Sequence, residues 1–102
     1  MLYLKISFEV LPDKKKEFEQ AVPWLVHADV LSEEDVKQQI LHENGKPVSF
    51  VYLGECETRE KLESHLRSER FRALWGGMKL LGKITEAKIV TSDKIEDLDQ
   101  TH

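Results

Sequence analysis

Residues 2–10 alternate strictly between two faces, one apolar and one largely polar, which is the pattern of a strand with one buried face. The apolar positions are Leu2, Leu4, Ile6, Phe8 and Val10, and the polar side of the strand carries Tyr3, Lys5, Ser7 and Glu9. Pro12 and Asp13 end this run. The chain therefore opens with a strand that the rest of the molecule must cover on one side.

A helix is predicted from about residue 13, because Asp13 can cap it and apolar residues then recur at helical spacing. These residues are Phe18, Ala21, Val22 and Leu25. Pro23 lies inside the pattern, where it lacks a backbone donor and crowds the preceding turn. We expect the helix to kink or restart at Pro23.

Residues 36–43 and 48–55 predict a hairpin, with Asn44 and Gly45 as a two-residue turn. On the returning strand, Phe50 and Tyr52 share one face with Val48, whereas Val51 and Leu53 lie on the other. Both faces are apolar, and a chain of this length can cover only one of them with its own helices. The second face predicts a homodimer that forms through the open side of the sheet.

A second helical region follows Thr58, which can serve as its cap. Its first two apolar positions, Leu62 and Leu66, are one residue out of step with the later stripe of Phe71, Leu74, Trp75 and Met78. We therefore expect a bend near Ser68. Gly82 can end this region, residues 84–91 predict a last strand, and residues 92–102 form a polar, acidic tail.

The predicted order is strand, helix, strand, strand, helix, strand. It indicates an α+β fold of the ferredoxin-like, split βαβ kind, with a four-stranded antiparallel sheet. We expect one domain over residues 1–91 and a tail over residues 92–102, since 102 residues are the size of a single small domain.

Composition excludes several classes of protein. The net charge is −4, without the clustered basic residues of a nucleic-acid-binding protein, and no apolar run approaches the roughly 20 residues of a membrane span. The single cysteine, Cys56, excludes an internal disulfide, and we interpret it as a packing residue. We expect a cytoplasmic protein with no nucleic-acid or membrane partner.

The run from Phe50 to Phe71 resembles the signature of the antibiotic biosynthesis monooxygenase domain, in which a strand is followed by a helix with the pattern His-Leu-x-Ser-x-x-Phe. His65, Leu66, Ser68 and Phe71 match that pattern. The resemblance implies a dimeric α+β barrel with a pocket between helices and sheet. Its best-understood members oxidise phenols or quinols with molecular oxygen and use no flavin, haem or metal. A small aromatic substrate, molecular oxygen and no cofactor are therefore implied here.

The sequence also departs from the family pattern. Arg70 stands where many relatives have a second histidine, and the Gly-Cys pair that often leads into the second strand is absent between Asp29 and Val36. The first strand has no asparagine, and the helix does not carry the Trp and His order of the haem-degrading branch. Haem degradation is therefore disfavoured.

The resemblance implies His65 as the catalytic base, since a histidine suits removal of a phenolic proton near neutral pH. Trp24, Tyr52, Phe71 and Trp75 are the candidate substrate-binding residues. Four of these residues have an alternative without a site: His65 satisfied by solvent or a neighbour, Tyr52 in cross-strand packing, Trp75 in the core and Trp24 at an interface. At the level of function, the alternative is a non-catalytic dimeric module that binds a small molecule or has a structural role. No spacing of His, Cys or carboxylate residues predicts a metal site.

Overall fold

The structure, a computed structural model, describes residues 1–27, 36–43, 45, 48–92 and 95–97. The side chains of residues 22–27 and of Glu96 are outside this description. The helices and strands are β1 (Leu2–Val10), the short 3-10 turn η1 (Pro12–Lys14), α1 (Lys15–His27), β2 (Val36–His42), β3 (Ser49–Cys56), α2 (Arg59–Leu66), α3 (Glu69–Leu81), β4 (Gly82–Val90) and β5 (Ile95–Asp97). None of the described helices is long and apolar enough to span a membrane.

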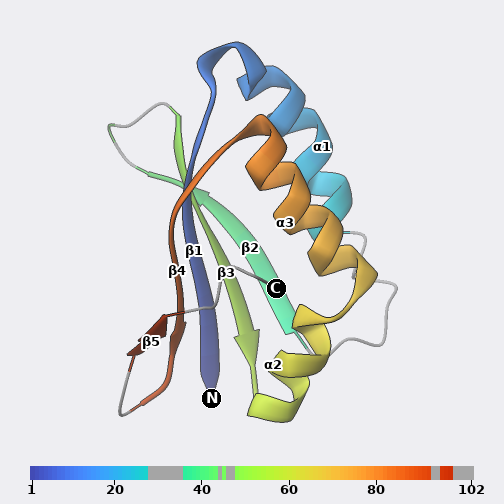
Figure 1. The fold of residues 1–102 in the computed structure, drawn as a ribbon, viewed down its shortest axis with the longest axis vertical. Helices are drawn as coiled ribbons and strands as arrows, with labels where there is room; N and C mark the ends of the chain where they lie inside the picture. Colours follow the sequence, from blue (N-terminus) through green and yellow to red (C-terminus); the bar gives the residue numbers. More distant parts are fainter. Residues whose placement is uncertain (28–35, 44, 46–47, 93–94, 98–102) are drawn as a thin grey trace.

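The strands form one antiparallel sheet in the order β2-β3-β1-β4-β5, and the helices cover one of its faces (Figure 1). The first four strands have the predicted ferredoxin-like arrangement, so this part of the prediction is confirmed. β5 was not expected: three residues of the acidic tail pair with β4 at the edge of the sheet. The opposite face of the sheet, called the open face below, is covered by none of the described helices (Figure 1).

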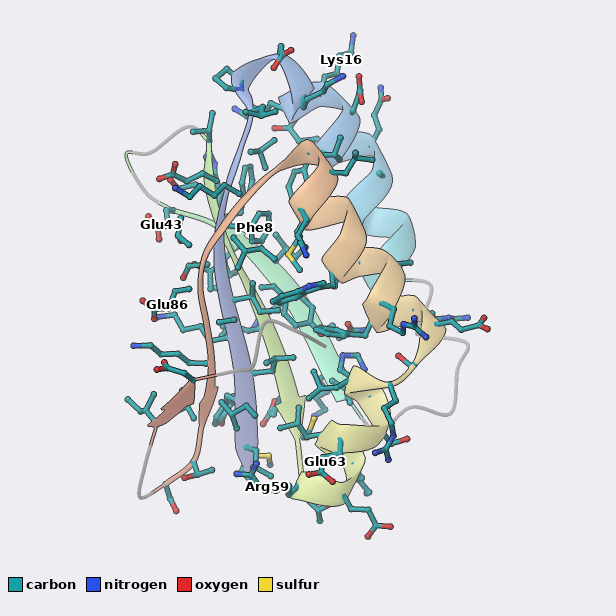
Figure 2. All side chains as sticks on the ribbon, viewed as in Figure 1. Phe8, Lys16, Glu43, Arg59, Glu63 and Glu86 are labelled. Atoms are coloured by element: carbon teal, nitrogen blue, oxygen red, sulfur yellow. The ribbon has the colours of Figure 1, made fainter. Side chains whose placement is uncertain are left out.

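β1 is the central strand, and its alternation is reproduced in the burial of its side chains. Its apolar side chains are all buried under the helices, and Figure 2 shows Phe8 on that side and Glu86 on the other. Near one end of the sheet, the rings of Phe8, Phe18 and Phe50 pack together with centroids 4.8 to 5.9 Å apart. The His42 ring stacks on Phe50 at the edge of this cluster, with centroids 4.7 Å apart. The three phenylalanines fix α1 against the sheet.

Two local predictions are wrong. α1 runs from Lys15 across Pro23 to His27 as one helix, so the restart is wrong and only the alternative of a kink at Pro23 stays a prediction. The hairpin does not use a two-residue turn, because Glu43 pairs with Ser49 through a 2.8 Å hydrogen bond and five residues lie between them. Gly45, in that loop, has a φ of 78°, the left-handed conformation that glycine adopts without strain.

The predicted bend at Ser68 is confirmed, since α2 ends at Leu66 and α3 begins at Glu69. α3 then leads without a loop into β4 at Gly82. The φ of Gly82 is −169°, which any residue can adopt, so its conformation does not explain the glycine. The explanation is close packing, because a Cβ at Gly82 would overlap the carbonyl oxygen of Glu9 on the neighbouring strand.

Candidate functional site

Three polar side chains meet beneath the helices, between β2, β3 and α2. The Tyr52 hydroxyl donates a hydrogen bond to Oε1 of Gln38 at 2.6 Å, and it lies 2.9 Å from Nε2 of His65. Tyr52 is fully buried, and His65 is 2 % exposed. Buried hydrogen bonds of this kind are costly to break, so the group, called the Gln38–Tyr52–His65 chain below, holds its members in defined positions.

The sheet register explains how the Tyr52 hydroxyl reaches both partners. Gly54 lies two residues further along β3, on the same face, and is paired with Gln38 on β2. A Cβ at Gly54 would stand 3.0 Å from the Tyr52 hydroxyl. The missing side chain thus leaves the space in which the tyrosine ring lies along the strand and its hydroxyl meets Gln38.

The directions of these bonds determine the protonation of the histidine ring. A tyrosine hydroxyl has one proton, and here Tyr52 donates it to Gln38. Nε2 of His65 must then carry a proton and donate it to the tyrosine oxygen. In a neutral ring with this tautomer, the basic lone pair lies on Nδ1.

The junction between α2 and α3 positions His65 relative to Phe71. The Ser68 hydroxyl donates to the His65 carbonyl oxygen at 2.7 Å and accepts from the Phe71 backbone N–H at 3.1 Å. It therefore caps the start of α3 while it holds the end of α2. The Ser and Phe of the sequence motif have a clear structural reason: they fix the histidine at the helix junction.

Phe71 also connects the polar group to Trp75. Its ring centroid is 5.1 Å from that of His65, 6.3 Å from that of Tyr52 and 6.0 Å from that of Trp75. The Trp75 indole is buried, and its Nε1 has no acceptor among the described residues. Four of the five predicted site residues thus form one contiguous aromatic group.

A pocket of about 460 Å³ opens beside this group, on α3 and the end of α2. Its volume is in the range of ordinary small-molecule sites. The described residues that line it are Leu66, Phe71, Arg72, Trp75, Gly76, Lys79 and Leu80. A smaller hollow of about 240 Å³ adjoins it at Trp75 and Lys79 and extends to the start of β4.

The structure separates the predicted site residues into two sets. Phe71 and Trp75 line the pocket, whereas Tyr52 and His65 are buried against the Phe71 ring and are not among the described lining residues. Trp24 is in α1, and its side chain falls outside the described residues. The sequence analysis missed Gln38, which no spacing singled out, and Gly76, whose only signal was a helix-weakening glycine beside the aromatic stripe.

Neither Cys56 nor a cluster of metal-binding side chains forms part of the described site. Cys56 is buried, and burial, reinforced by the charge of Glu55, raises the pKa of its thiol from 9.0 to about 11. Such a thiol is protonated at neutral pH and is a poor nucleophile, which agrees with a packing role. Within the described part of the chain, no three His, Cys, Asp or Glu side chains gather as potential metal ligands.

No protein-family model and no curated protein matches the sequence. Solved structures do match it over nearly their whole length. One, described as an antibiotic biosynthesis monooxygenase, has a TM-score of 0.73 and 17 % identity and covers 97 % of this chain and 99 % of its own. SnoaB from Streptomyces nogalater, described as a cofactor-independent oxygenase, has a TM-score of 0.73 and 17 % identity. The match covers 91 % of this chain and 93 % of SnoaB. A conserved protein from Methanosarcina mazei Go1 has a TM-score of 0.72 and 19 % identity, and the match covers 96 % of this chain and 92 % of that protein.

The TM-scores establish a likeness of fold, and identities of 17 to 19 % establish nothing beyond it. The predicted resemblance is confirmed at that level, because the neighbours superpose on more than nine-tenths of this chain with TM-scores of 0.72 to 0.73. The chain has the fold of the antibiotic biosynthesis monooxygenase domain.

Proposed function

We propose that the protein is a cofactor-independent monooxygenase that oxidises a small phenolic or quinol compound with molecular oxygen. The observation that carries the proposal is the contact of the Gln38–Tyr52–His65 chain with Phe71, which belongs to the aromatic wall of the pocket. One structural neighbour, SnoaB, is described as an oxygenase that needs no cofactor, which supports the same chemistry.

In this reaction the substrate supplies the electrons. A ring CH₂ or its enol form reacts with O₂ to give a ring carbonyl and water, so one oxygen atom enters the product and the other leaves as water. The protein has to exclude water, orient the ring and accept the phenolic proton. We assign the proton to His65, with Tyr52 and Gln38 holding the ring and its tautomer.

Phe71 has a particular place in this proposal, because it lines the pocket and its ring centroid is 5.1 Å from that of His65. It is the described residue that contacts both the pocket and the ring of the proposed base. The Trp75 and Phe71 rings would form the wall against which an aromatic substrate stacks.

The test is oxygen uptake by the purified protein with a panel of quinols, beside His65→Gln. Glutamine can still donate to Tyr52, so the fold should be kept, and circular dichroism with a thermal melt checks this. We expect turnover to fall by roughly a hundredfold or more in His65→Gln, as is usual when a general base is lost. His42→Gln makes the same change at an exposed strand residue and should keep full activity. An unchanged rate in His65→Gln would refute the role of this histidine.

A second candidate function is a non-catalytic module that binds a small hydrophobic molecule. The observation that favours it is the burial of His65 and its hydrogen bond to Tyr52, which a purely structural role would also explain. This module would bind quinols in the pocket without any oxygen uptake above the uncatalysed rate.

We further propose that the protein is a homodimer formed through the open face of the sheet. Six apolar side chains project from this face: Tyr3, Leu41, Val51, Leu53, Val90 and Ile95. Tyr3 is 42 % and Leu41 46 % exposed in the single chain, so pairing of two open faces would remove apolar surface from water.

Light scattering after size-exclusion chromatography tests the dimer. The wild type should elute as a dimer, and Leu53→Glu, which places a charge in the middle of the face, should elute as a monomer. Leu11→Glu adds the same charge at an exposed residue that lies outside the strands, and it should leave the dimer intact. A wild-type monomer at micromolar concentration would contradict this proposal.

A further inference from the structure

The pocket on α3 combines an apolar wall with positive charge. Leu66, Phe71 and Trp75 form the wall, while Arg72 and Lys79 are the charged residues that line it. No acidic residue is among the described lining residues. Arg72 and Lys79 form no ion pair with another described residue, so their charges are not neutralised within that part of the chain.

The helix places the two cations on one face. Arg72, Gly76 and Lys79 follow one another at steps of four and three residues, which puts all three along the same side of α3. The glycine therefore lies between the two positive charges. A ligand that covers the backbone of Gly76 comes within reach of both.

Gly76 has no conformational reason to be glycine. It is in the middle of a regular helix, where glycine costs about 1 kcal/mol relative to alanine, and a Cβ built there would meet nothing within 4 Å. Gly82 differs, since a Cβ there would overlap the backbone of β1. The consequence of the missing side chain at Gly76 is open space in the pocket between Arg72 and Lys79.

We propose that this pocket selects apolar ring compounds that carry an anionic group, such as an aromatic carboxylate, sulfonate or phenolate. The ring lies against Phe71 and Trp75 over Gly76, and the anion is recognised by Arg72 and Lys79. The inference rests on the proposed function in one respect: the oxygenase substrate would belong to this class of ligand. Binding itself requires no catalysis, so it is tested separately from oxygen uptake.

Two fluorescent probes that differ in the anion provide the test. 1-Anilinonaphthalene-8-sulfonate carries a sulfonate, and N-phenyl-1-naphthylamine has the same rings without it. We expect the wild type to bind the sulfonate probe roughly five- to tenfold more tightly, as two partly exposed ion pairs of a few tenths to 1 kcal/mol each would produce. Added salt should lower the affinity for the sulfonate probe and leave the affinity for the neutral probe unchanged.

Charge variants locate the anion. Arg72→Gln and Lys79→Gln should each lower the affinity for the sulfonate probe about two- to fivefold and leave the affinity for the neutral probe unchanged. Arg67→Gln removes the same charge from an exposed residue that is not among the described lining residues, and it should change neither affinity. Equal losses in all three variants would show only a general effect of net charge and would overturn the proposal.

Gly76→Leu fills the space between the cations and should abolish binding of both probes, while Gly76→Ala should weaken it less. Both substitutions favour the helix, so their melting temperatures should not fall, and a melt checks this. Retained binding in a folded Gly76→Leu, or equal wild-type affinity for the two probes, would overturn the assignment. Specific binding without oxygen uptake on any quinol would leave this inference standing and refute the oxygenase proposal.

Discussion

The Tyr52 hydroxyl and Nε2 of His65 lie 2.9 Å apart in the interior, and this contact links strand β3 to helix α2. The same hydroxyl donates to Gln38 on β2, so three successive elements of the chain share one buried oxygen atom. A single tyrosine thus holds the histidine that the proposed chemistry needs.

Tyr52→Phe should therefore reduce both stability and activity. It leaves the buried polar atoms of Gln38 and His65 without the hydroxyl, which costs about 1 to 3 kcal/mol in the free energy of unfolding. Urea denaturation measures that cost. Oxygen uptake should fall as well, because the histidine tautomer loses its partner. Tyr3→Phe, on the open face, is the matched control and should change stability by less than about 0.5 kcal/mol.

Gly54→Ala should disturb the same contact from the opposite side. The new methyl group would stand 3.0 Å from the Tyr52 hydroxyl and 3.3 Å from its ring, so the tyrosine must move by a few tenths of an ångström. We expect a loss of about 1 to 2 kcal/mol, in the range of overpacking changes. The loss should be smaller in the Tyr52→Phe background, where the closest atom is gone, and a double-mutant cycle measures this coupling. Equal losses in both backgrounds would contradict the explanation.

Gly82→Ala should be the most damaging of the glycine substitutions. The added Cβ would overlap backbone atoms of Glu9 and Val10, and neither backbone can retreat without breaking the β1 to β4 pairing. We expect a loss of more than about 3 kcal/mol, enough to unfold a marginally stable small domain. Gly76→Ala is the control, and thermal unfolding should show it at least as stable as the wild type.

Cys56 makes stability depend on alkaline pH. Its thiol pKa is about 11 in the folded chain and returns toward the ordinary value of 9.0 on unfolding, so the unfolded state loses its proton first. The associated stabilisation is complete below pH 9 and disappears as the pH rises through 11, for a total of about 3 kcal/mol. Urea unfolding at a series of alkaline pH values should show this decline. Cys56→Ala lacks the titrating group, and an identical decline in that variant would contradict the assignment.

The sequence was most informative where periodicity alone determines structure. The alternation of residues 2–10 predicted β1 with its buried face, and the phase break near Ser68 predicted the bend at which α2 gives way to α3. Both patterns depend on local geometry. The predicted cap at Thr58 also follows a local rule, and its hydroxyl accepts the hydrogen bond from the Lys61 backbone N–H. Ser68 caps α3 in the same way, although the sequence analysis did not name it as a cap.

The candidate site depends on strand register, and local pattern could not supply it. A two-residue turn at Asn44 and Gly45 would pair Gln38 with Val51, on the opposite face of the sheet from Tyr52. The observed register pairs Gln38 with Gly54 and brings its side chain to the Tyr52 hydroxyl. An odd shift in register exchanges the two faces of a strand, so the error in the turn concealed the third member of the polar group.

The central claim is that this chain inserts one atom of molecular oxygen into an aromatic substrate without a cofactor. The most direct measurement is mass spectrometry of the product formed by purified wild type under oxygen-18 gas, with a quinol that supports oxygen uptake. The account predicts one labelled oxygen atom in each product molecule, the second labelled atom in water, and no label above background with His65→Gln. Product without the label, or hydrogen peroxide formed in equal amount to the product, would contradict it.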